Sequence, residues 1–247
     1  MTARNTSFSL LAAFGLACAV TAAAQDAPVN DPALKGAIDI HSHLDPDGFG
    51  PGRNGRNMDV LDMAKLAKDA GMRGFVIKMH YDQSADDAYI VRKLYPDLEV
   101  FGGIGTNFAT GHNAPEEVLL MVKEARRLGL PVVVTHPLLE SVGMNLEQMK
   151  QAVEMGAYLE FVTAFTREER TIKEYSEAIR EIGPEHCIVS SDKGQGRGEE
   201  GHDGPSVSHV QGLAEAAQIL RKNGFTEAEL DLMFKDNPAK LLGLPAL

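Results

Sequence analysis

Short apolar runs rich in β-branched residues alternate along the chain with longer stretches whose apolar positions recur every three or four residues. Continuous apolar runs predict strands buried on both faces, and the 3.6-residue period predicts amphipathic helices. The expected strands cover residues 37–43, 74–80, 98–107, 131–137, 157–163 and 186–192. The expected helices cover residues 57–70, 84–94, 114–128, 145–155, 168–182, 206–223 and 226–241. This alternation predicts an α/β fold with a parallel sheet in a single domain.

The beginning of the chain has the pattern of an export signal rather than of a folded element. Arg4 precedes an apolar run over residues 10–20 that is too short to span a bilayer, and small residues at 22 and 24 stand before Gln25. We therefore expect a signal peptide over residues 1–24, a single domain over residues 25–247, and a periplasmic or secreted protein. A lipoprotein signal through Cys18 is less favoured, because Gly15 stands where such signals usually carry a large aliphatic residue.

The expected mature chain is acidic and retains only one cysteine, Cys187. The formal net charge of −11 becomes −12 when Arg4 is removed, which makes nucleic acid and anionic membranes poor partners. No intramolecular disulfide can form, and no later stretch is long and apolar enough for a membrane span. A small-molecule substrate is the partner that we expect.

Residues that bind metals or move protons stand at the ends of five of the six expected strands. They are His41 with His43, His80, His136, Glu160 and Asp192, and His112 follows the third strand. The carboxyl ends of parallel strands meet at one edge of a sheet, and a closed barrel gathers all of them at one mouth. The pattern therefore predicts one shared site.

His41 and His43 are the strongest metal-ligand candidates. They lie two residues apart in a strand, so their side chains point to the same side, and two neutral imidazoles on one side form half of a metal site. A chance spacing among 8 histidines is the alternative. His136 lies between a β-branched run and Pro137, where an unpaired imidazole would be costly. His112 stands in a strand-to-helix turn, either as a ligand or as a neighbour of the helix N-cap.

Several motifs together resemble the amidohydrolase superfamily of metal-dependent hydrolases. They are "DIHSH" (39–43), "ATGH" (109–112), "VVTHP" (133–137), "VSSD" (189–192) and "KDNPAKLLGL" (235–244). The resemblance implies a TIM-like (β/α)₈ barrel and a divalent metal, with Zn²⁺ preferred. It implies that the metal ligands are His41, His43, His112, His136 and Asp192. It also implies that Asp192 takes a proton from the attacking water; a capping role at a turn is the alternative.

The chain is most similar to an amidohydrolase-related family whose function is uncharacterised. The similar segments are "VIKMH" (76–80), "TGHNAPEEV" (110–118) and "VGMNLEQ" (142–148). One βα segment that such proteins place after the third strand is missing here, because residues 98–107 run almost directly into "FATGH". We therefore expect an incomplete or distorted barrel, and a homo-oligomer in which a partner closes the barrel remains open.

Lys78 and His80 share one face of the second expected strand. If this face points into the barrel, Lys78 is a buried amine that needs an anion, either from the substrate or through its own carboxylation. Pairing with Glu160 across the barrel is the structural alternative. We expect Asp192 and Lys78 to act in catalysis and Lys78, His80 and Glu160 to bind substrate. His202 and His209, in or after a glycine-rich loop, are expected to be exposed, and Cys187 to be a core residue.

The function expected from these residues and the resemblance is that of an exported metal-dependent hydrolase acting on an amide, ester, lactone or phosphoester. A metal-dependent decarboxylase or lyase of the same fold is one alternative. A catalytically inactive barrel that only binds a metal or ligand is the other.

Overall fold

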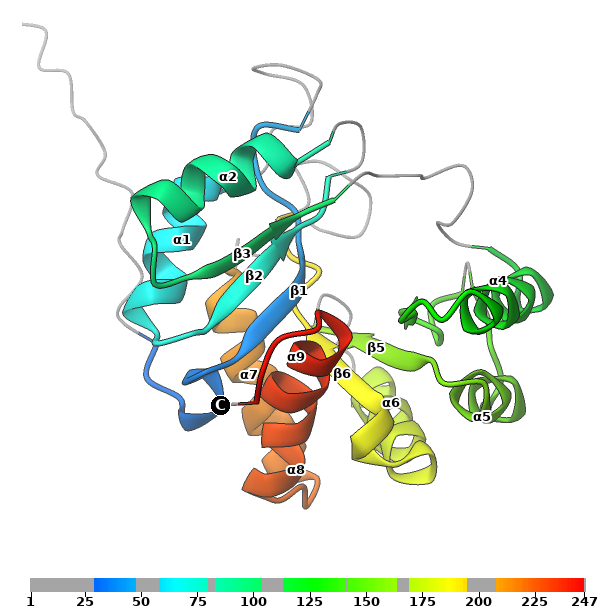
Figure 1. Ribbon diagram of the computed structural model, residues 1–247. Coiled ribbons are helices and arrows are strands. Elements are labelled where there is room, and N and C mark those ends of the chain that lie inside the picture. Colours follow the sequence, from blue (N-terminus) through cyan, green and yellow to red (C-terminus); the bar gives the residue numbers. More distant parts are fainter. Residues whose placement is uncertain are drawn as a thin grey trace, which may run out of the picture.

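The computed structural model of the protein describes residues 29–47, 58–79, 83–103, 113–140, 142–163, 169–194 and 208–246. Its strands form two three-stranded parallel sheets with helices packed along them (Figure 1). The expected signal peptide lies outside the described residues. None of the described helices is long and apolar enough to cross a bilayer.

The first sheet has the strand order β1-β2-β3. Its strands are β1 (Ile38–Ser42), β2 (Gly74–Ile77) and β3 (Glu99–Gly102). Two helices, α1 (Val60–Asp69) and α2 (Ala85–Leu94), connect these strands in chain order and lie along the sheet (Figure 1). All five residues of β1 are buried, as expected for a strand covered on both faces.

The second sheet repeats this arrangement with the order β4-β5-β6. Its strands are β4 (Val133–Thr135), β5 (Tyr158–Val162) and β6 (Cys187–Ser190), connected by α5 (Leu146–Glu154), α6 (Glu169–Ile182) and the short η3 (Pro184–His186). Helix α4 (Pro115–Arg127) precedes β4. An Asn145–Gln148 capping box begins α5, where each of the two side chains accepts a hydrogen bond from the other residue's backbone N–H.

The two sheets meet where β1 lies beside β6. The backbone N–H of His43 donates to the carbonyl of Lys193 at 3.1 Å, and that of Asp192 donates to the carbonyl of His41 at 2.9 Å. The strands therefore follow the order β3-β2-β1-β6-β5-β4, with the first strand beside the last as in an α/β barrel. Among the described residues, no ladder joins β3 to β4, which agrees with the expected incomplete barrel. Residues 104–112, including the end of the expected third strand and the "FATGH" segment, lie outside the described residues.

The C-terminal part of the chain packs against β1 and β6 (Figure 1). Helix α7 (His209–Lys222) contacts β6, and the short η1 (Pro32–Leu34) packs against α7. After α8 (Glu227–Asp231), the π-helical turn η4 (Leu232–Asp236) and α9 (Asn237–Leu241) contact both strands. The side-chain amide of Asn237 donates to the carbonyls of Pro184 and Cys187 at 2.8 and 2.7 Å. The asparagine of the "DNPAKLLG" segment therefore ties the last helix to the start of β6.

Cys187 is fully buried, and burial raises the pKa of its thiol. This confirms the prediction of a core residue rather than a nucleophile.

Candidate metal centre

Strand β1 aims His41 and His43 into the same space. Ile38 and Ile40 point to one side of β1 and pack on Ile188 and Ala239. His41 and His43 have the other parity and point to the opposite side. The two histidines are 2% and 1% exposed, and Asp192, the second residue after β6, is 4% exposed. The contact between β1 and β6, called the β1–β6 seam below, joins residues 41–43 to residues 192–193. It brings His43 and Asp192, which are 149 positions apart, into one buried cluster.

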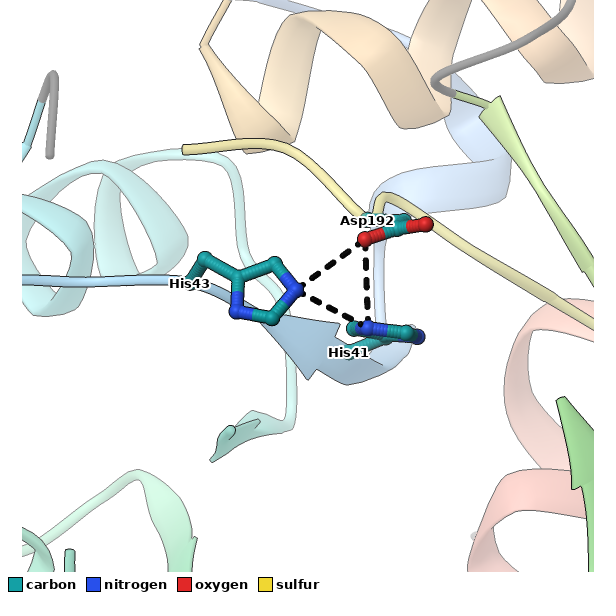
Figure 2. Close-up of side chains that lie close together, drawn as sticks. All are labelled: His41, His43 and Asp192. Carbon is teal, nitrogen blue, oxygen red and sulfur yellow. Dashed lines mark hydrogen bonds and ion pairs between the residues drawn. The ribbon is translucent and has the colours of Figure 1, made fainter. Parts of the chain in front are cut away.

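The three side chains converge through one atom each (Figure 2). The distances between His41 Nε2, His43 Nε2 and Asp192 Oδ1 are all 3.1 Å. Ligand atoms around a tetrahedral Zn²⁺ are about 3.3 Å apart, given bonds of about 2.0–2.1 Å. Because a carboxylate oxygen has only lone pairs to offer, a proton or a cation must lie between it and the imidazole nitrogens. The donor set and its spacing therefore fit a divalent transition metal.

Two non-glycine residues of the described chain have positive φ angles, and both belong to this site. They are Asp192, with φ of 47°, and His136, with φ of 34°. His136 directly follows β4, and Asp192 is the second residue after β6. Such backbone geometry costs about 1–3 kcal/mol and persists where the surroundings impose it. Here both turns redirect a side chain at the strand end toward the centre.

His136 lies beside the centre, with its ring centroid 6.1 Å from that of His41. Burial lowers the pKa of His136 to about 4, with His41 and Lys78 acting in the same direction and Asp192 and Glu160 against it. His136 is therefore neutral at pH 7, as a metal ligand must be.

Burial and the neighbouring histidines shift the pKa of Asp192 in opposite directions. Burial alone would raise its pKa, but His41, His43 and His136 outweigh burial and hold the pKa well below its usual range. Asp192 is therefore an ionised carboxylate at neutral pH, able to bind a cation.

Glu160 and Lys78 meet the opposite nitrogen of the His41 ring. Nδ1 of His41 lies 3.2 Å from Oε1 of Glu160 and 3.3 Å from Nζ of Lys78. Lys78 directly follows β2, is half-buried, and also lies 3.5 Å from the hydroxyl of Thr135. The sequence predicted both residues near the site, and the structure places both against His41.

Asp39 and Ser191 hold the β1–β6 seam in place behind the cluster. Asp39 Oδ1 accepts hydrogen bonds from the backbone N–H groups of His41 and Ser191 at 3.1 and 3.0 Å, and Oδ2 accepts from Ser42 at 3.1 Å. The Ser191 hydroxyl donates to the carbonyl of His41 at 3.0 Å. Asp39 is thus an acceptor that positions the ligand-bearing backbone. The role of Ser191 was missed from the sequence, although it stands in the "VSSD" segment at the end of β6.

The prediction that His209 is exposed was wrong. This residue begins α7 after the N-cap Ser208, and it is fully buried. A Cβ added at Gly194 would lie 3.1 Å from the ring of His209 and 1.8 Å from the carbonyl oxygen of His43, so only glycine fits between them. Close packing of α7 on the β1–β6 seam buries the histidine, which a loop-like sequence context does not reveal.

His80, His112 and His202 lie outside the described residues. Their predicted roles stay predictions, as do the substrate-binding roles of Lys78 and Glu160.

Solved structures share this architecture at low sequence identity. A probable 2-pyrone-4,6-dicarboxylic acid hydrolase from Acinetobacter baumannii is 12% identical, with a TM-score of 0.56 over 85% of this chain and 100% of that one. The phosphotriesterase homology protein from Escherichia coli is 17% identical, with a TM-score of 0.52 over 85% and 99%. Enamidase, a member of the amidohydrolase superfamily, is 15% identical, with a TM-score of 0.53 over 85% and 68%. The chain thus has the barrel fold of these hydrolases, as the resemblance predicted.

The sequence also matches one protein family. A family model described as a family of unknown function (DUF6282) matches residues 36–107 and 105–160, about half of the chain, and the protein belongs to this family. None of the curated proteins matches the chain.

Proposed function

We propose that the protein is an exported metal-dependent hydrolase. The observation that carries the proposal is the convergence of His41 Nε2, His43 Nε2 and Asp192 Oδ1 at mutual distances of 3.1 Å in a buried site. Their position at the carboxyl ends of β1 and β6, where α/β barrels carry their chemistry, supports a catalytic rather than a structural centre. The similar structures include a probable 2-pyrone-4,6-dicarboxylic acid hydrolase and enamidase of the amidohydrolase superfamily, which support the same reaction class.

Zn²⁺ is the cation that we propose for the site, held by His41, His43 and Asp192 and joined by His136. Imidazole nitrogens with one carboxylate oxygen suit Zn²⁺ better than the hard cations Mg²⁺ and Ca²⁺, which prefer oxygen ligands throughout. When bound, such an ion supplies Lewis-acid chemistry: it polarises the oxygen of the scissile group and lowers the pKa of a water molecule to about 7.

The protein's own residues supply orientation and proton transfer. Asp192 is an ionised carboxylate at the centre, so it can accept a proton from the attacking water and return it to the leaving group. Asp39 and Ser191 fix the backbone that carries His41 and Asp192. The water attacks the carbon of a carbonyl group or the phosphorus of a phosphoryl group that lies within reach of these residues.

Metal analysis and solvent-isotope labelling test the proposal together. The purified mature protein should contain close to one equivalent of Zn²⁺ or more, and a panel of amides, esters, lactones and phosphoesters should yield at least one product carrying ¹⁸O from labelled water. Turnover without ¹⁸O would indicate a decarboxylase or lyase. Ligands that bind and are recovered intact would indicate an inactive binding barrel.

Lys78 is proposed to bind an anionic group of the substrate. We expect Lys78→Met, which keeps the apolar volume and removes the charge, to lower kcat/KM by roughly 10- to 100-fold, the range for one lost hydrogen bond to a charged group. Its melting temperature should stay near that of the wild type. A clear drop in melting temperature, with normal turnover of the folded fraction, would instead assign Lys78 to the pair with Glu160.

Export is proposed from the N-terminal pattern of Arg4, an apolar run and small residues before Gln25. Mass spectrometry of the protein from the cell envelope or medium should find the mature N-terminus at or near Gln25. Soluble protein that keeps Met1 in the cytoplasm would contradict the proposal.

A further inference from the structure

Glu160 lies at the centre of a buried hydrogen-bonded chain that ends on a metal-ligand candidate. It is the middle residue of β5 and is 1% exposed. Its Oε1 atom accepts a hydrogen bond from the hydroxyl of Ser190 and lies 3.2 Å from Nδ1 of His41. The hydroxyl of Ser190 is the donor in this chain, so Oε1 of Glu160 is an acceptor, and an ionised carboxylate accepts hydrogen bonds and donates none.

The position of one proton on His41 decides whether the ring can bind a cation. A neutral imidazole carries its proton on one nitrogen and a lone pair on the other. Nε2 of His41 is the atom that faces His43 and Asp192, so binding there requires the proton to be on Nδ1. A carboxylate next to Nδ1 stabilises this tautomer, because Nδ1–H can then donate to it.

Lys78 favours the opposite tautomer. Its Nζ lies 3.3 Å from the same Nδ1 atom, and an ammonium group has protons to donate but no lone pair to accept one. If Nδ1 carried the lone pair, Lys78 could donate to it, and the proton of His41 would move to Nε2. Glu160 and Lys78 therefore act on one nitrogen in opposite directions.

We propose that Glu160 is a positioning residue that keeps the proton of His41 on Nδ1 and so keeps Nε2 free to bind a cation. It does so against Lys78 at Nδ1 and, in the metal-free protein, against Asp192, whose Oδ1 lies 3.1 Å from Nε2 and would accept a proton placed there. This inference rests on the proposed metal centre. It gives Glu160 a role through His41 rather than through contact with a substrate.

The test measures the tautomer of His41 in the metal-free protein, together with affinity for Zn²⁺. Long-range ¹H–¹⁵N NMR at mildly alkaline pH should assign the Nδ1–H form to His41 in the wild type. Glu160→Met keeps a similar volume and removes the acceptor, so His41 should change to the Nε2–H form. Competition with a chromophoric chelator should then show Zn²⁺ binding about 10- to 100-fold more weakly, the usual cost of removing a partner of a ligating histidine.

Two further variants separate this role from a merely structural one. Glu160→Met/Lys78→Met removes both opposing groups and leaves no unpaired buried charge, so it tests the inference even if the single variant does not fold. We expect the Nε2–H form to appear in it and part of the Zn²⁺ affinity to return relative to Glu160→Met. Thr163→Val removes a buried hydrogen bond, 2.9 Å to the carbonyl of Ser191, without touching Nδ1 of His41, and should change neither measurement.

Persistence of the Nδ1–H form alone in the Glu160 variants, or unchanged Zn²⁺ affinity, would overturn the inference. So would an equal loss of affinity in Thr163→Val, because it would trace the effect to general loosening. The tautomer is measured without metal, so this result stays separate from a failure of the metal centre itself.

Discussion

Replacing both His41 and His43 with alanine is expected to abolish metal binding and hydrolysis together. The two Nε2 atoms and Asp192 Oδ1 are the three atoms that converge on one point. Of the four proposed ligands, the double variant leaves only Asp192 and His136. Binding free energies of about 10–16 kcal/mol at four-ligand zinc sites imply that losing two ligands removes roughly half of the binding energy. Elemental analysis of the purified variant should find almost no metal, and turnover should fall to background.

His186→Ala is the matched control for this experiment. His186 ends η3 at the amino end of β6, away from the catalytic edge, and its side chain is 44% exposed. This variant should keep full metal content and activity. Circular dichroism and a thermal melt must establish that the double variant is folded, since it leaves a cavity among buried residues. Full metal occupancy in the folded double variant would place the metal site elsewhere.

The pairing of His41 with His43, and of both with Asp192, was predictable because it depends on simple regularities. The two-residue period of a strand places the histidines on one side, and parallel strands bring their carboxyl ends to one edge. The same regularities place Glu160 and Lys78 toward the site. They do not say which atom each side chain meets, so the contact of both with Nδ1 of His41 came only from the structure.

Other features depend on packing between distant segments and have no local signal. His136 precedes Pro137, a position that favours extended backbone, yet its φ is 34° because the turn after β4 directs it to the centre. His209 is buried because α7 packs on the β1–β6 seam, whereas its position after a glycine-rich loop indicated exposure. Local preference was overridden at both residues, and both lie at or next to the site.

Asp192→Asn is expected to separate metal binding from proton transfer. Asparagine is nearly isosteric, tolerates the positive φ of 47° at this position, and still presents an oxygen to the metal, so the backbone and much of the metal content should survive. It cannot accept a proton from the attacking water, and losing a general base typically costs about 10²- to 10⁴-fold in rate. Metal content and kcat should be measured on the same preparation, with the wild type alongside. If metal and turnover fell in equal proportion, Asp192 would be a ligand only; if both were kept, another group would take the proton.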